Sequence, residues 1–163
     1  MSLLPLILWP DHRLSQICGP VGEENFEAVV EDMFDTMYAE NGRGLAGPQV
    51  GIMRRIFVMD VSWKSGNPTP EAFLDPVITV RENRQTIIEE GCLSIPGLMV
   101  PVERPIAVTL AWRGARGDMH MRDFDGLEAR CIQHEIDHLN GLLTLDHLTK
   151  TRRSEVLSGY QPS

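Results

Sequence analysis

The segment Gln133–His138, with the sequence QHEIDH, constrains this chain more than any other segment. In a helix, His134 and His138 share one face, because residues four apart are neighbours there. Two imidazoles placed in this way can bind one divalent metal. The adjacent Glu135 can exchange a proton with a water molecule at that metal. The segment therefore predicts a helix that carries part of a hydrolytic metal site.

The surrounding residues predict that this helix turns the motif toward the protein interior. Asp125 is expected as the N-cap, with Glu128 three residues later as in a capping box, and Asn140-Gly141 is a typical helix end. Burying imidazole and carboxylate groups without partners is costly, and a bound metal would neutralise them. The alternative is a helix with two surface histidines. At helical spacing the predicted inward face consists of Leu127, Cys131, His134, Glu135, His138 and Leu142.

A catalytic site of the zinc type needs three protein ligands and one open position, so a third ligand must come from elsewhere. The chain has three cysteines. Cys18 is expected to be a small buried apolar residue. Cys131 lies three residues before His134, and because helical side chains lean toward the N-terminus, we expect a core or pocket thiol there. Cys92 is either a metal ligand or a buried cysteine at a strand end, and sequence chemistry leaves both possibilities open.

Two further segments contain motifs that support the interpretation of QHEIDH as part of a metal site. One is Gly42–Gln49, with the sequence GRGLAGPQ, and the other is Glu90–Ser94, with the sequence EGCLS. In order and in separation, the three segments resemble the motifs G-x-G-x-A-A-P-Q, E-G-C-x-S and Q-H-E-x-D-H of the peptide deformylases. The likeness extends over about residues 6–148, because Ile7–Leu14 and Val102–Pro105 also resemble family segments.

This resemblance implies an enzyme that removes the formyl group from the N-terminal formyl-methionine of new polypeptides and releases formate. It implies that Cys92, His134 and His138 bind one divalent metal. Fe(II) is the usual metal of the family, and Zn(II), Ni(II) or Co(II) is the alternative. In such a site the metal activates a water molecule, and Glu135 transfers the proton of this water to the leaving nitrogen.

The resemblance also implies roles for residues around the metal. The side-chain amide of Gln49 and the backbone N–H of Leu93 would bind the developing oxyanion, where one donor can contribute roughly 3–4 kcal/mol. Gly44 would let the substrate backbone pass closely, because it has no side chain. A phosphate-binding loop is excluded, because no Lys-Ser or Lys-Thr follows the glycines. The other residues that match the substrate groove are Arg43, Leu45, Leu127 and Cys131.

Three positions depart from the family pattern. Arg43 stands where a small aliphatic residue is usual, Gly47 where alanine is usual, and Met99 where many members have an arginine that helps to hold the peptide. These departures leave the predicted ligands and Glu135 unchanged. Arg43 and Met99 favour, as a rival, a metal hydrolase for a different N-acyl peptide. A catalytically silent paralogue is a second rival, and the retained Glu135 counts against it. Asp137 is either a partner of a ligand imidazole or a carboxylate paired with a distant arginine.

The chain of 163 residues is expected to form one domain, 1–163, with a deformylase-like core in 1–148 and a short tail in 149–163. We predict the α+β class, with mixed or mostly antiparallel sheets packed around the metal-bearing C-terminal helix and a long N-terminal helix. The expected helices are Glu23–Glu40 and Gly126–Leu139. The expected strands are Arg55–Val61, Leu74–Val80, Thr86–Glu90, Ile106–Trp112 and Met119–Phe124.

The composition limits the kinds of partner that the protein is expected to bind. The net charge of −8 argues against binding to nucleic acid or to an anionic membrane. We expect a cytoplasmic monomer, because the sequence shows no membrane span, signal peptide or disulfide framework. The expected partner is an N-formylated peptide. Some deformylases dock on the ribosome through a longer C-terminal helix, so Lys150, Arg152 and Arg153 are either a remnant of such a contact or a solvated basic patch.

Overall fold

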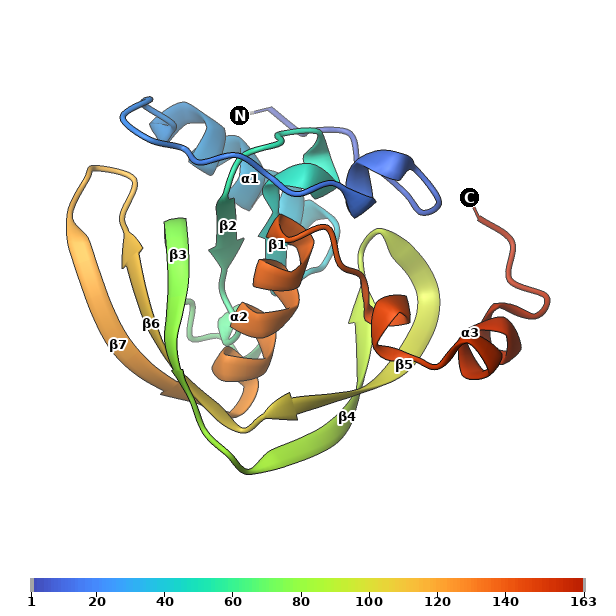
Figure 1. Ribbon diagram of the computed structural model, residues 1–163. Coiled ribbons are helices and arrows are strands. Elements are labelled where there is room, and N and C mark those ends of the chain that lie inside the picture. Colours follow the sequence, from blue (N-terminus) through green and yellow to red (C-terminus); the bar gives the residue numbers. More distant parts are fainter. Residues whose placement is uncertain (1, 163) are drawn as a thin grey trace.

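The computed structural model describes residues 2–162, in which two antiparallel sheets lie on either side of helix α2 (Figure 1). The larger sheet has the strand order β1-β2-β3-β6-β7, and β4 and β5 form a separate hairpin. The predicted α+β class is confirmed. The strands are β1 (Gly44–Ala46), β2 (Ile56–Met59), β3 (Glu71–Arg81), β4 (Gln85–Cys92), β5 (Ile95–Pro105), β6 (Ala107–Arg113) and β7 (Met119–Asp125). The helices are α1 (Glu27–Ala39), α2 (Gly126–Leu139) and α3 (Lys150–Leu157), with 3-10 turns η1 (His12–Ser15), η2 (Gly47–Val50), η3 (Trp63–Ser65) and η4 (Thr144–His147).

Strand β2 shows why the larger sheet is covered on both faces. All four of its residues are buried, and successive side chains of a strand point to opposite faces. Phe57 and Met59 pack with the apolar side of α2, and Ile56 and Val58 pack with α1. Phe57 stacks on Phe73 with ring centroids 4.5 Å apart. The sheet therefore holds α2 rigidly from one side.

Helix α2 has the predicted bounds but differs from the prediction in two details. Asp125 occupies the N-cap position, yet its side chain accepts no capping hydrogen bond, so the predicted capping box does not form. Leu127 and Leu142 are exposed rather than buried, and Leu127 lines a cavity. The predicted end holds, since Gly141 has a φ of +75° and a Cβ there would lie 2.7 Å from the carbonyl oxygen of Ser15.

The hairpin β4–β5 was only partly predicted. The chain turns at Leu93-Ser94, so that Cys92 pairs with Ile95. The register also shifts between Glu90 and Cys92, which is a bulge at the metal-ligand end of the strand. Strand β5 then continues to Pro105 and contains three prolines, which a strand tolerates when one of its edges is unpaired.

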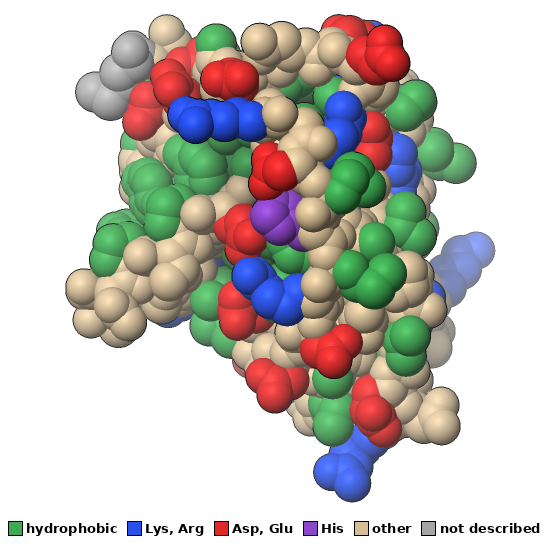
Figure 2. Space-filling view, turned by 90° about the vertical axis from the view of Figure 1, so that its left-hand side faces the viewer, with side chains coloured by type: hydrophobic (Ala, Val, Ile, Leu, Met, Phe, Trp, Pro, Cys, Tyr) green, Lys and Arg blue, Asp and Glu red, His purple; other side chains and the backbone are tan. Residues whose placement is uncertain are grey.

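The face that carries β7 is mixed in character (Figure 2), and the tail contains one more helix. On the face at the left of Figure 1, where β7 lies, acidic, basic and hydrophobic side chains are mixed (Figure 2). The tail contains helix α3, which the sequence did not predict, capped by the side chain of Thr149. Within residues 2–162, no helix has the length and apolar character that crossing a bilayer requires.

Gly47 offers a test of this packing. A Cβ added at Gly47 would lie 2.4 Å from the carbonyl oxygen of Ile52 and 3.0 Å from that of Arg54, both of which are backbone atoms. We therefore expect Gly47→Ala to lower the free energy of unfolding by about 1–3 kcal/mol. Urea denaturation followed by circular dichroism measures this change. Gly19→Ala is the matched control, because a Cβ there meets nothing within 4 Å. Equal denaturation midpoints for the two variants would contradict the expectation.

Candidate metal centre

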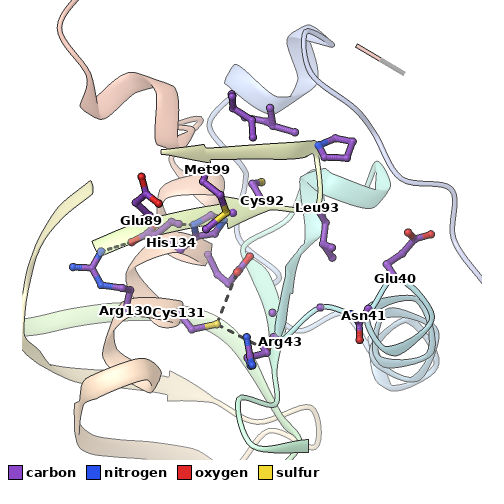
Figure 3. A pocket seen from close by; sticks show the side chains of 18 of the residues that line it. Glu40, Asn41, Arg43, Glu89, Cys92, Leu93, Met99, Arg130, Cys131 and His134 are labelled. Atoms are coloured by element: carbon purple, nitrogen blue, oxygen red, sulfur yellow. Dashed lines mark hydrogen bonds and ion pairs between the residues drawn. The ribbon is translucent and has the colours of Figure 1, made fainter. Parts of the chain in front are cut away.

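Three predicted ligands meet between the hairpin and α2. One ligand atom each of Cys92, His134 and His138 lies within 4.8 Å of the others. The sulfur of Cys92 is 3.4 Å from Nε2 of His138, and the two imidazole centroids are 5.1 Å apart. Cys92 comes from the end of β4, and His134 comes from α2 (Figure 3). His138 lies four residues after His134 on the same face of α2. Such a thiolate and two imidazoles suit Zn(II), Fe(II), Co(II) or Ni(II), so these residues fit one divalent metal.

A buried ion cluster behind the site holds His134 in place. Nδ1 of His134 donates a hydrogen bond of 2.9 Å to Oε1 of Glu90. Arg104 binds the same carboxylate through two nitrogens, at 2.6 and 2.9 Å, and Arg130 binds it as well. Because Glu90 occupies Nδ1, the Nε2 atom of His134 remains available for a metal.

The charges of the residues in this cluster balance one another. Burial alone would raise the pKa of Glu90, but the hydrogen bonds from His134 and Arg104 outweigh burial and hold this pKa well below its usual range. Asp137 binds Arg104 at 2.9 Å and His147 at 2.7 Å. Of the two interpretations of Asp137, the structure therefore supports the pairing with a distant arginine.

The pKa values of the two histidines are shifted in opposite directions. Burial lowers the pKa of His138 well below its usual value, and the positive charges of His134 and Arg104 act in the same direction. His138 is therefore neutral, as a metal ligand must be. Burial also acts to lower the pKa of His134, but the charges and hydrogen bonds of Glu135, Cys92 and Glu90 raise it well above its usual value. These groups therefore favour a positive charge at the centre, and a bound divalent cation would carry one.

Glu135 is buried close to the three predicted ligands. It is 4% exposed, and within residues 2–162 its Oε1 has no hydrogen-bond partner. Burial raises its pKa to about 7, while the charge of His134 acts to lower it. A Cβ on Gly44 would lie 2.6 Å from Oε2 of Glu135 and 2.8 Å from the sulfur of Cys131. Only a glycine at this position leaves the Glu135 carboxylate its space.

Gln49 is fixed beside Cys92. It is buried, and its Oε1 accepts a hydrogen bond of 2.9 Å from the backbone N–H of Ala46. Its Nε2 donates to the hydroxyl of Ser94 at 3.1 Å and lies 3.6 Å from the sulfur of Cys92. The amide N–H groups of Gln49 therefore point toward the turn that contains Leu93.

The N-terminal segment connects the same two parts of the site. The N–H of Ile7 donates to the carbonyl of Gln49 at 2.7 Å, and the N–H of Trp9 donates to the carbonyl of Ser94 at 2.8 Å. These two backbone bonds hold η2 and the hairpin turn at a constant separation. The distance between Gln49 and Cys92 is therefore set by backbone structure on both sides.

A cavity of about 780 Å³ opens in front of the centre. Met99, Glu89 and Cys92 lie along one wall, and Arg43 and Asn41 lie opposite them (Figure 3). Leu45, which we predicted at the substrate groove, is instead fully buried and packs with α1, so any contact with a substrate would use its backbone. The predicted groove residues that do line the cavity are Arg43, Gly44, Leu127 and Cys131.

The sequence alone predicts no role for Glu90, Arg104 and Arg130, beyond the place of Glu90 in EGCLS. Glu90 lies 14 residues from Arg104 and 40 from Arg130, so no local spacing indicates that they meet. Their buried charges are the structural signal that identifies them.

The fold and the centre define a class of metal-binding hydrolases, in which two histidines of a helix and a cysteine of a hairpin surround a carboxylate in a cavity. The sequence profile of the polypeptide deformylase family matches residues 3–154. The chain therefore belongs to the polypeptide deformylase family, and the resemblance noted in the sequence is confirmed.

Individual relatives agree with this assignment. A peptide deformylase of Afipia carboxidovorans is 42% identical over 98% of this chain and 95% of the relative, and one of Brucella suis is 43% identical over 99% and 93%. The crystal structure of a peptide deformylase from Synechococcus elongatus in complex with actinonin superposes with a TM-score of 0.90, at 35% identity, over 98% of this chain and 88% of that one. That of the Thermotoga maritima peptide deformylase has a TM-score of 0.85 at 38% identity, over 91% and 99%.

Proposed function

We propose that this chain is a metal-dependent amide hydrolase that removes the formyl group from the N-terminal formyl-methionine of newly made polypeptides and releases formate. The observation that carries the proposal is the placement of Glu135, buried and with a free oxygen, beside the cluster of Cys92, His134 and His138. Membership of the polypeptide deformylase family supports the same reaction.

The proposed roles follow from the positions of the side chains. A divalent metal held by Cys92, His134 and His138 supplies Lewis-acid activation of water. Glu135 accepts the proton of the attacking water and delivers it to the nitrogen that leaves as a free amine. The amide of Gln49 and the backbone N–H of Leu93 donate to the formyl oxygen as it gains negative charge.

We propose Fe(II) as the physiological metal, with Zn(II), Ni(II) or Co(II) as substitutes. A mixed thiolate and imidazole set accepts all four, and affinity order alone does not select among them. The support for Fe(II) is the family's usual metal. Metal analysis of protein purified without oxygen and without added metal distinguishes these ions.

The setting of the reaction is part of the proposal. We place it in the cytoplasm, where new polypeptides emerge, and expect the protein to act as a monomer. A transient contact with the ribosome would use helix α3, which carries Lys150, Arg152 and Arg153. Arg152 binds Glu155 and Arg153 binds Asp146, so part of this basic charge is already neutralised.

The test is formate release from formyl-Met-Ala-Ser by protein prepared without oxygen and loaded with Fe(II) or Ni(II). We expect rapid release that ends when a chelator removes the metal. Acetyl-Met-Ala-Ser and propionyl-Met-Ala-Ser are the matched substrates, and we expect them to react far more slowly. If the fully loaded protein cleaves an acetyl or propionyl peptide but not the formyl peptide, a different N-acyl specificity is correct. If it cleaves none of them, the catalytically silent alternative is correct.

A further inference from the structure

Two cationic side chains, Arg43 and Lys64, line the cavity, and Arg43 lies opposite Met99 and Glu89 (Figure 3). Both are exposed, and Arg43 directly precedes Gly44, the residue that packs against Glu135. Arg43 also replaces the small aliphatic residue that is usual at this position. A charged residue therefore stands directly before the glycine that packs against the proposed proton carrier.

Neither cation is neutralised by the protein. Within residues 2–162, neither Arg43 nor Lys64 forms an ion pair with a carboxylate. Burial and the charge of Arg43 together lower the pKa of Lys64, so the two cations are close enough to repel each other. Glu40 and Glu89 also line the cavity, but both are exposed and bind neither cation.

A set of specific contacts joins the two segments that carry the cations. The indole N–H of Trp63 donates to the carbonyl of Gly42 at 2.8 Å, which fastens the turn carrying Lys64 to the segment carrying Arg43. Trp63 also packs edge-on against Tyr38, with centroids 5.2 Å apart. The Tyr38 hydroxyl donates to Asp60 at 2.6 Å, and the N–H of Asp60 donates to the carbonyl of Arg43 at 2.8 Å. The backbone beneath both cations is therefore well defined.

Two like charges on these exposed side chains repel each other weakly, because water screens them. A substrate carboxylate would remove the repulsion. The chain as a whole carries a net charge of −8, so its overall field does not attract anions, and an anion must be bound locally.

We propose that Arg43 and Lys64 select formyl peptides with an acidic side chain at the second or third residue. The inference rests on the proposed function and specifies its substrate class. The position follows from spacing: neighbouring Cα atoms are about 3.8 Å apart, and an extended peptide advances about 3.3 Å per residue. A cation on the residue next to Gly44 therefore lies one or two peptide residues beyond the amide that reacts beside Glu135.

The first experiment compares isosteric peptides with the metal-loaded, full-length protein. The pairs are formyl-Met-Asp-Ser with formyl-Met-Asn-Ser, and formyl-Met-Ala-Asp with formyl-Met-Ala-Asn. We expect kcat/KM to favour the acidic peptide of at least one pair about fivefold to tenfold at low ionic strength, the contribution of two partly exposed ion pairs. The difference should lie in KM, because the contact is distant from the reacting bond. In about 1 M salt, where the Debye length is about 3 Å, the preference should shrink.

The double variant Arg43→Met, Lys64→Met should remove the preference, and each single variant should remove part of it. Arg116→Met is the matched control, since it removes one exposed positive charge from the β6–β7 turn, outside the cavity lining. It should keep the wild-type ratio of acidic to neutral peptide. Equal kcat/KM for both members of both pairs in the wild type would overturn the inference, as would a preference that the double variant retains.

A binding measurement separates this inference from the proposed function. Metal-loaded Glu135→Ala protein is expected to turn over the peptides about 10²–10⁴-fold more slowly, so their dissociation constants can be measured by calorimetry before they are consumed. We expect tighter binding of the acidic peptide by about fivefold to tenfold, lost when Arg43→Met and Lys64→Met are added. Equal binding overturns the inference even if formyl-Met-Ala-Ser is cleaved rapidly. If the Glu135→Ala protein binds the acidic peptide more tightly but the wild type cleaves no formyl peptide, the inference about Arg43 and Lys64 stands and the proposed deformylase activity is refuted.

Discussion

Glu135→Ala should reduce formate release by about 10²–10⁴-fold while the protein keeps its metal. The reason is that metal binding and proton transfer are assigned to different residues. The three proposed ligands are Cys92, His134 and His138, and Glu135 is buried beside them with an unpartnered oxygen. Removing the carboxylate takes away the group that moves the proton but none of the groups that hold the metal.

The measurement combines formate release with metal content by elemental analysis. Glu128→Ala is the matched control, because Glu128 is a carboxylate of the same helix that lies outside the cavity lining. This control should retain full turnover and full metal. A Glu135→Ala protein that loses its metal, or that keeps wild-type turnover, would show that the role given to Glu135 is wrong.

Glu90→Gln should have the largest effect on stability. Glu90 is buried and binds Arg104, Arg130 and His134 at once. The glutamine keeps the size of the side chain but removes the negative charge, which leaves buried guanidinium groups without their main counter-ion. Losing one partner of a buried ion pair typically lowers the free energy of unfolding by about 3–5 kcal/mol.

Denaturant unfolding of the metal-free protein measures this loss, and a metal competition assay measures the effect on the centre. Because Glu90 orients His134, metal affinity should also fall by about 10–100-fold. Glu89→Gln is the matched control, since the adjacent carboxylate is exposed, and its effect should stay within about 0.5 kcal/mol. Equal stability of the two variants would refute the structural role of Glu90.

The parts of the fold that the sequence predicted are those with strong local patterns. Helix α2 was predicted with its observed bounds, because its apolar spacing and Gly141 mark it clearly. Five of the seven strands were predicted with ends that differ by a few residues, since alternation and turn residues bound them. Strand β1 was missed because three residues are too short for a periodic signal. Strand β5 was missed because its prolines indicated a break.

The parts of the site that could not be predicted depend on contacts distant in sequence. The ion cluster around Glu90 joins residues from β4, β5 and α2, and no spacing rule connects them. The burial of Leu45 depends on which face of β1 meets α1, which a three-residue strand does not reveal. Arg43 and Lys64 are brought together by the Trp63 contact with Gly42, and that pairing is visible only in the folded chain.

The separation of the two sheets has a consequence for local unfolding. The hairpin β4–β5 shares no ladder with the larger sheet in the described chain, yet it carries Cys92, while the larger sheet supports the helix that carries His134 and His138. A metal bound by all three residues would therefore add a cross-link between two parts of the molecule that share no strand ladder. We expect the amide hydrogens of the hairpin to be those whose exchange with solvent slows most when the metal binds.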